Sequence, residues 1–375
     1  MIQDENVIVY LLSQVPNLKV HGRTAGSLAP LTLFWTGSAI EFNVKASELW
    51  IEVESGYQTS EPWVTILINS VPVSRQMLAT GRYWICAFRG MNADVVKNVL
   101  VVKDTQAMSG DPDCVMQIHA VKSDGEFLPI KERPYKIEFI GDSITSGEGA
   151  IGGKAEEDWV PMWFSAVNNY CAITADALNA DYRILSQSGW GVLSSWDNNP
   201  HANIPDSYEK VCGLLTGEKN KALGALEEND FDAWQPDVIV VNLGTNDAAA
   251  FYSPAWKDEV TGEVFKQRQN EDGLYNEEDL AAFESAATKF LAKLRKYNAN
   301  AHIVWAYGML GIPMMPAIYR AVDGYVKMSG DKLVSVFQLP NTTAETVGAR
   351  RHPGAPAHGR AANELTAFIK QLLAR

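Results

Sequence analysis

Short apolar runs separated by turn residues fill the first third of the chain. Examples are LTLFWTGSAIEFNV, ELWIEVES, EPWVTILINSVPV and CVMQIHAV, which are rich in β-branched residues and are not interrupted by a helical period. Short strands at this spacing are typical of a β-sandwich or jelly roll. We therefore expect residues 1–130 to form such a domain, followed by GEFLPIKERP as a linker.

After Pro134 the pattern changes to strands that alternate with helices. The expected strands are YKIEFIG, YRILSQ, PDVIVVNLG, AHIVWAYG and LVSVFQL. A helix is expected over about residues 162–179, and apolar residues at helical spacing mark EEDLAAFESAATKFLAKLRKY and AANELTAFIKQLLAR. This alternation predicts an α/β domain over residues 135–375, built on a doubly wound parallel sheet.

Composition and charge narrow the classes of partner and location. The formal net charge is −13, which argues against nucleic acid as a partner because its binding requires basic patches. No apolar run approaches the roughly 18 residues that a membrane span needs, so no membrane association is expected. The first residues lack the basic start and long apolar core of an export signal. This predicts a cytoplasmic protein, or a secreted one if a signal has been removed.

The cysteines and histidines do not indicate a metal site. Cys86, Cys114, Cys171 and Cys212 form no CxxC pair, and the chain contains no HExxH motif. We expect four buried free thiols and no metal or organic cofactor. The sequence does not indicate an oligomeric state.

Four residues with catalytic potential follow the predicted strands or precede the last helix. Ser143 lies in GDS after YKIEFIG, Gly189 in SQSGW after YRIL, Asn246 in GTND after VIVVNLG, and His352 in RRHPG. Each motif by itself is more often an ordinary turn. Functional groups in an open α/β sheet, however, gather at the carboxyl ends of the strands. There a Ser can act as a nucleophile, a His as its base, and N–H groups as donors to an oxyanion.

The order Ser143, Gly189, Asn246, His352 resembles the SGNH (GDSL-like) hydrolase superfamily over about residues 135–375. The resemblance implies a flavodoxin-like sheet and a serine esterase without a cofactor. It implies that Ser143 is the nucleophile and His352 the general base. The oxyanion hole would then consist of the Ser143 and Gly189 backbone N–H groups and the Asn246 side chain.

The segment HGRTAGSLAPLTLFWTGSAIEFNVKASELWIEVE is similar to the N-terminal jelly roll of carbohydrate esterase family 2. This second resemblance implies removal of O-acetyl groups from plant polysaccharides or oligosaccharides, such as acetylated mannan or xylan, with preference for the sugar 6-hydroxyl. Trp190 and Trp196 are the candidates for stacking against sugar rings. Two alternatives remain open: another SGNH activity (lipase, thioesterase or arylesterase), and a catalytically inert carbohydrate-binding protein.

One position departs from the superfamily pattern. The residue three places before the catalytic His is usually Asp, but here it is Ala349. A catalytic His needs one ring nitrogen held as a donor so that the other can accept the serine proton. We therefore expect a backbone carbonyl in the loop before His352 to accept that N–H group.

Overall fold

A computed structural model describes residues 7–374 of the 375-residue chain. The chain forms two compact units. Among the described residues, the first contains residues 7–133, 160–167 and 210–229, and the second contains residues 134–159, 168–209 and 230–374. Two short segments that the sequence places in the α/β domain therefore pack within the β unit.

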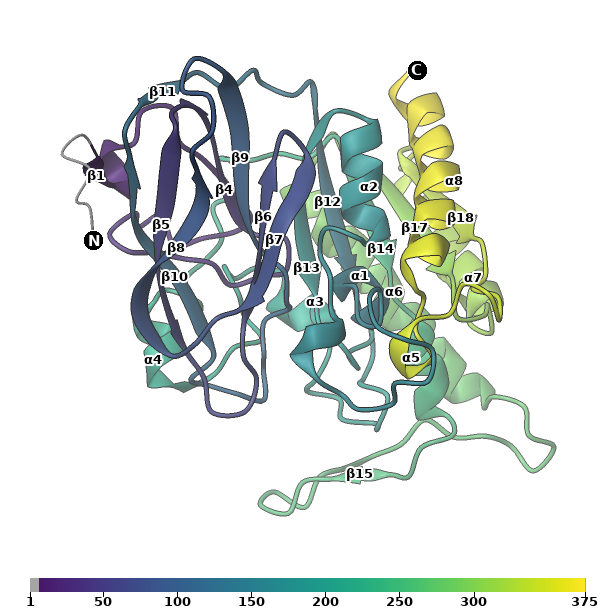
Figure 1. Cartoon of the computed structure of the whole chain (residues 1–375). Helices are drawn as coiled ribbons and strands as arrows, with labels where there is room; N and C mark the ends of the chain where they lie inside the picture. Colours follow the sequence, from purple (N-terminus) through teal and green to yellow (C-terminus); the bar gives the residue numbers. More distant parts are fainter. Residues whose placement is uncertain (1–6, 375) are drawn as a thin grey trace. The chain divides into compact units, whose positions relative to one another are not determined.

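The first unit consists of two antiparallel sheets (Figure 1). Along strand β5, buried and partly exposed side chains alternate. Leu49, Ile51 and Val53 are buried, while the residues between them are partly exposed. These side chains share one core with Phe42 and Val101 of the other sheet, so the predicted jelly-roll type of sandwich is confirmed. One sheet has the order β1 (Ile8–Leu11), β10 (Val115–Ser123), β5 (Glu48–Gly56), β8 (Gly81–Arg89), with β3 (Leu31–Thr32) beside β10; the other has β11 (Glu126–Leu128), β4 (Ala39–Lys45), β9 (Val96–Lys103), β6 (Trp63–Ile68), β7 (Val71–Met77), with β2 (Lys19–His21) beside β4.

The second unit contains a five-stranded parallel sheet. Its order is β13 (Ala180–Ser186), β12 (Tyr135–Gly141), β14 (Val238–Asn242), β17 (His302–Gly308), β18 (Val334–Leu339). This is the flavodoxin-like order, and it confirms the predicted doubly wound sheet. The strand order reverses between β12 and β14, which is where ligands bind in such sheets.

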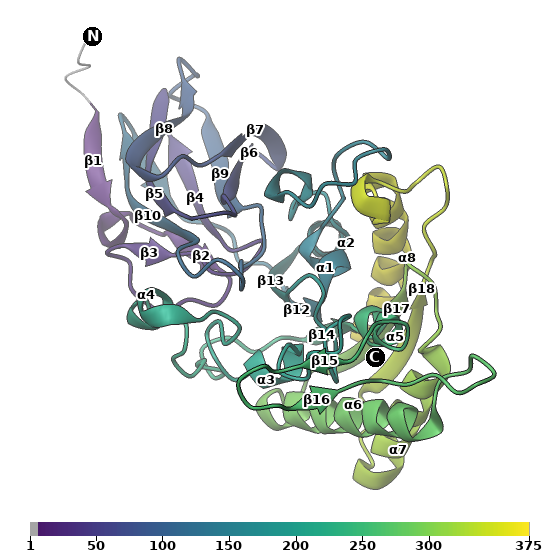
Figure 2. The same cartoon turned by 90° about the horizontal axis from the view of Figure 1, so that it is seen from below.

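Helices cover both faces of this sheet, with α2 and α8 on one side and α6 and α7 on the other (Figure 2). Helix α6 shows why the sequence forms a helix here. Asn276 caps its first turn by accepting from the Glu278 and Asp279 N–H groups. Phe283 and Phe290 belong to a stripe of buried side chains along the helix. The helices of the unit are α1 (Ser143–Ser146), α2 (Tyr170–Ala177), α3 (Ile204–Ser207), α5 (Thr245–Ala250), α6 (Glu277–Tyr297), α7 (Met315–Ser329) and α8 (Ala355–Leu373); α4 (Gly217–Ala222) belongs to the first unit.

Two expectations from the sequence are wrong. The helix expected over residues 162–179 is reduced to α2, which begins after its cap Asn169. The preceding residues pack in the β unit instead, where the Ala166 N–H donates to the buried Asp104 carboxylate at 2.7 Å. Cys86 is exposed on β8, whereas the other three cysteines are buried free thiols as expected.

The sequence also gave no indication of a two-stranded ribbon between α5 and α6, formed by β15 (Trp256–Lys257) and β16 (Val264–Phe265). It extends away from the parallel sheet of its unit (Figure 1). None of the helices in residues 7–374 is both long and apolar enough to cross a bilayer.

Candidate active site

Ser143 stands at the point where the parallel strand order reverses. Strand β12 ends at Gly141, and α1 begins at Ser143 after its cap Asp142, whose Oδ1 accepts from the Ile144 N–H at 3.0 Å. Only glycine fits before the cap, because a Cβ on Gly141 would lie 2.0 Å from Thr145 Oγ1. The tight strand-to-helix turn thus places the Ser143 hydroxyl at the carboxyl edge of the sheet.

His352 contacts Ser143 directly. Its Nε2 lies 3.0 Å from Ser143 Oγ, and its Nδ1 lies 2.8 Å from the backbone carbonyl oxygen of Arg350. A carbonyl only accepts, so Nδ1 carries the proton and Nε2 is left to accept the serine hydroxyl proton. The predicted backbone acceptor is confirmed. Among the described residues, no carboxylate hydrogen-bonds to Nδ1.

The loop that supplies this carbonyl has an unusual backbone. Arg350 and Arg351 have φ values of 53° and 57°, in the left-handed region that non-glycine residues seldom adopt. Three contacts hold Arg350 there: its N–H donates to the Glu156 carbonyl at 2.7 Å, its Nε to Glu148 Oε1 at 2.9 Å, and its Nη1 to the Glu157 carbonyl at 3.0 Å. These contacts fix the direction of the Arg350 carbonyl.

Glu148 is a site residue that the sequence reasoning missed. Its side chain is 3% exposed, it forms the ion pair with Arg350, and its Oε1 lies 3.9 Å from His352 Nε2. The carboxylate therefore places a negative charge beside both the histidine and the residue that orients it. The only hint in the sequence is a lone acid in SGEGA and two arginines before the histidine.

The three predicted oxyanion-hole residues are brought together by hydrogen bonds. Asn246, on α5, donates from Nδ2 to the Trp190 carbonyl at 2.9 Å and to Asp142 Oδ2 at 3.2 Å. It thereby bridges the neighbours of Gly189 and Ser143. Gly189 has φ +82°, and within the described chain neither its N–H nor that of Ser143 has a hydrogen-bond acceptor. Two backbone donors are thus free for an oxyanion.

Two buried carboxyl groups support this arrangement. Burial raises the pKa of Asp142 to about 7, and the charges of Asp247 and Glu148 add to the effect, while the hydrogen bond from Ile144 opposes it. Burial likewise raises the pKa of Asp247 to about 6. Asp247 Oδ1 accepts from the Leu193 N–H at 2.8 Å, which ties the Gly189 loop to α5.

Trp190 and Trp196 occupy different positions in the loop after β13. Trp196 is 52% exposed, and its backbone N–H donates to the Gly189 carbonyl at 2.9 Å. A Cβ on Gly189 would meet the Trp196 indole at 3.0 Å, so the ring packs against the glycine. Trp190 is partly exposed, and its carbonyl holds Asn246. Trp196 therefore offers an accessible aromatic face beside the free Gly189 N–H.

His358 is a structural residue. It lies fully buried in the first turns of α8, and its Nδ1 accepts from the Tyr170 N–H at 3.2 Å. Burial lowers the pKa of His358 to about 3, so it remains neutral. In the described residues no three His, Cys, Asp or Glu side chains are grouped as metal ligands.

Known proteins resemble this chain in both fold and sequence. The model of the GDSL-like lipase/acylhydrolase family matches residues 139–372. An acetyl xylan esterase (Est2A) from the rumen bacterium Butyrivibrio proteoclasticus is 44% identical, with 98% of this chain and 99% of that chain covered and a TM-score of 0.97. A family two carbohydrate esterase from Clostridium thermocellum, 24% identical over 95% of this chain and 99% of that chain, shares the fold with a TM-score of 0.78.

Two curated relatives align with nearly the whole chain. An acetylxylan esterase / glucomannan deacetylase from Cellvibrio japonicus is 26% identical over 96% of this chain and 89% of its own length. The cellulase/esterase CelE of Acetivibrio thermocellus is 26% identical over 90% of this chain, but this chain spans only 37% of the length of CelE.

The raised pKa of Asp142 predicts how stability depends on pH. In the unfolded chain this carboxyl ionises near pH 4, whereas in the fold its pKa is about 7. The folded state therefore binds the proton more tightly, so this group favours folding below about pH 4 and loses that contribution as the pH rises to about 7.

Asp142→Asn removes this titration. We expect the free energy of unfolding of the wild type, relative to the variant, to fall between about pH 4 and pH 7. Urea unfolding at several pH values measures the difference. A constant offset across this range would mean that Asp142 ionises normally in the fold.

Proposed function

This chain belongs to the GDSL-like lipase/acylhydrolase family, and from that premise we propose that it is a serine esterase that removes O-acetyl groups from plant polysaccharides or oligosaccharides. The observation that carries the proposal is the contact of 3.0 Å between Ser143 Oγ and His352 Nε2, with Nδ1 held as a donor. The relatives named for acetylxylan and glucomannan support an acetylated xylan or mannan as the substrate.

The first half of the reaction forms an acetyl-enzyme. Ser143 Oγ attacks the ester carbonyl carbon while His352 Nε2 accepts the hydroxyl proton. The resulting oxyanion accepts hydrogen bonds from the Ser143 and Gly189 backbone N–H groups. His352 then gives its proton to the sugar oxygen, the bond between that oxygen and the acyl carbon breaks, and the sugar leaves as an alcohol.

The second half releases acetate. A water molecule loses a proton to His352 Nε2 and attacks the acetyl carbon, the oxyanion forms again, and Ser143 leaves with the proton returned by His352. Asn246 contributes a third donor in both halves. The oxyanion competes with Asp142 Oδ2 for the Asn246 Nδ2 hydrogen, because this hydrogen bond is the longer of the two, at 3.2 Å. No step needs a metal or an organic cofactor.

The chemistry of the sugar chain decides which ester is available. Xylose has no sixth carbon, so preference for a 6-O-acetyl group applies to hexose chains such as mannan, and on xylan the ester must be on a ring hydroxyl. We propose that the half-exposed Trp196 receives the apolar face of a sugar ring next to the ester. Trp190 contributes chiefly by holding Asn246 through its carbonyl.

Ser143→Ala tests the nucleophile and the function together. We expect a folded protein whose acetate release from acetylated xylan and glucomannan falls by several orders of magnitude, because the acetyl-enzyme cannot form. Acetate is measured enzymatically, and folding is checked by circular dichroism. Retention of more than about a tenth of the wild-type rate would exclude Ser143 as the nucleophile. A wild type that prefers long acyl esters would indicate a lipase, and one without turnover would indicate a binding protein.

Glu148→Gln tests whether the carboxylate beside His352 contributes charge. We expect kcat to fall on the order of tenfold to a hundredfold with little change in KM, because the imidazolium formed in the transition state loses a nearby negative charge.

The matched control is Glu157→Gln, which makes the same substitution at another glutamate that contacts the loop before His352. Glu157 is 59% exposed, and among residues 7–374 its side chain pairs only with the exposed Arg351, at 3.2 Å. Steady-state kinetics on 4-nitrophenyl acetate compares the two variants. Similar kcat values for Glu148→Gln and the wild type would mean that Glu148 is only a structural partner of Arg350.

A further inference from the structure

The connection between α5 and α6, residues 251–276, leaves the body of its unit and returns to it. We call this segment the arm. It carries the β15–β16 ribbon (Figure 1), and apolar side chains near its tip are largely exposed, Val260 at 95% and Val264 at 61%. Its tip therefore adds little to the core of the unit, whereas the base of the arm forms specific hydrogen bonds.

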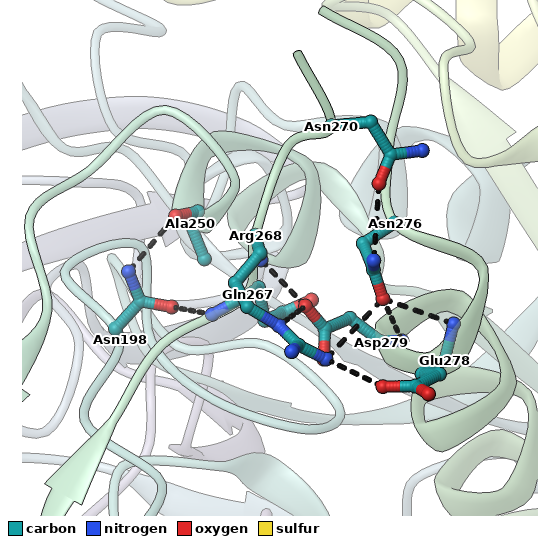
Figure 3. Close-up of polar contacts among 8 residues, drawn as sticks. All are labelled: Asn198, Ala250, Gln267, Arg268, Asn270, Asn276, Glu278 and Asp279. Carbon is teal, nitrogen blue, oxygen red and sulfur yellow. Dashed lines mark hydrogen bonds and ion pairs between the residues drawn. The ribbon is translucent and has the colours of Figure 1, made fainter.

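The returning end of the arm is clamped to the start of α6. Arg268 Nε and Nη2 donate to the two carboxylate oxygens of Asp279, each at 2.9 Å, and Nη2 also donates to Glu278 at 3.0 Å (Figure 3). The Asn276 N–H, at the helix cap, donates to the Arg268 carbonyl at 2.9 Å. A bidentate guanidinium–carboxylate pair is geometrically specific, so the residue before it, Gln267, is also fixed in place.

One buried side chain joins both ends of the arm to the loop after β13. Asn198 is fully buried with φ +67°. Its Nδ2 donates to the Ala250 carbonyl at 2.9 Å, and its Oδ1 accepts from the Gln267 N–H at 2.8 Å (Figure 3). Nδ2 also donates to the Pro254 carbonyl at 2.9 Å. Gln267 Nε2 adds a second link by donating to Ser194 Oγ at 2.9 Å.

The loop held in this way carries Trp196. The Asn198 backbone N–H donates to the Ser195 carbonyl at 3.1 Å, and the Trp196 backbone N–H donates to the Gly189 carbonyl at 2.9 Å. Hydrogen bonds and the short backbone segment between them thus link the base of the arm to the backbone of Trp196, whose indole packs beside Gly189. Buried networks of this kind fix a single arrangement, since each unsatisfied group would be costly.

We propose that Asn198 is a positioning residue through which the base of the arm holds Trp196 against Gly189 and so sets the selectivity for esters on sugar chains over small esters. This rests on the proposed function, because it assigns Trp196 to sugar binding. Asn198 itself touches no substrate. Its effect therefore acts on the sugar and leaves the attack on a small acetyl ester less affected.

Asn198→Gly removes the side-chain hydrogen bonds without a backbone penalty, since glycine accepts positive φ. With acetylated xylo-oligosaccharides we expect kcat/KM to fall on the order of tenfold, mainly through KM. With 4-nitrophenyl acetate the fall is expected to be severalfold smaller. The matched control is Asn179→Gly, since Asn179 also has positive φ, 49°, but is exposed in the turn after α2; it should retain the wild-type ratio.

A double-mutant cycle with Trp196→Ala identifies the route of the effect. If Asn198 acts through Trp196, adding Asn198→Gly to Trp196→Ala causes little further loss of selectivity. Equal losses on both substrates in Asn198→Gly, or additive losses in the double variant, would overturn the proposal.

If Asn198→Gly does not fold, Gln267→Ala removes only the link to Ser194 and should shift selectivity in the same direction by less. A wild type inactive on both esters would refute the proposed function, whereas an active wild type and an unchanged ratio in the variant would refute this inference alone.

Discussion

The hydrogen bond from His352 Nδ1–H to the Arg350 carbonyl, at 2.8 Å, is the interaction on which the site depends. It selects the tautomer in which Nε2 can accept the Ser143 proton. A loop carbonyl can do this only if its direction is fixed. Two successive left-handed residues and the ion pair with the buried Glu148 fix it here. The strain in this loop is therefore a structural requirement of the contact between His352 and Ser143.

A carbonyl replaces only part of what a carboxylate provides. It orients the ring by accepting the hydrogen bond from Nδ1–H, but it carries no full negative charge to stabilise the imidazolium. In the proposed mechanism Glu148, whose Oε1 lies 3.9 Å from Nε2, supplies such a charge. Orientation and charge, which one Asp combines in most serine hydrolases, are here divided between a backbone group and a carboxylate 202 positions earlier in the chain.

The sequence predicted the features that depend on local pattern. Ser143, Gly189 and Asn246 follow buried parallel strands, and the topology of such a sheet brings their ends together; the fold class follows from the same alternation. Features that depend on tertiary contacts were not predictable. The pairing of Glu148 with Arg350 and the links from Asn198 to the arm join distant segments. The helix expected from residue 162 is shortened because Asp104 of the β unit binds the backbone at Ala166.

The Arg350 carbonyl holds the proton on His352 Nδ1. Nitrogen NMR of the enzyme labelled with ¹⁵N-histidine, above the pH at which the ring is charged, reports which ring nitrogen carries hydrogen. The His352 signals are identified by their loss in His352→Gln. The structure predicts a protonated Nδ1 and an unprotonated Nε2, with the Nδ1 proton shifted downfield by its hydrogen bond. A proton on Nε2, or an even mixture of the two tautomers, would contradict it.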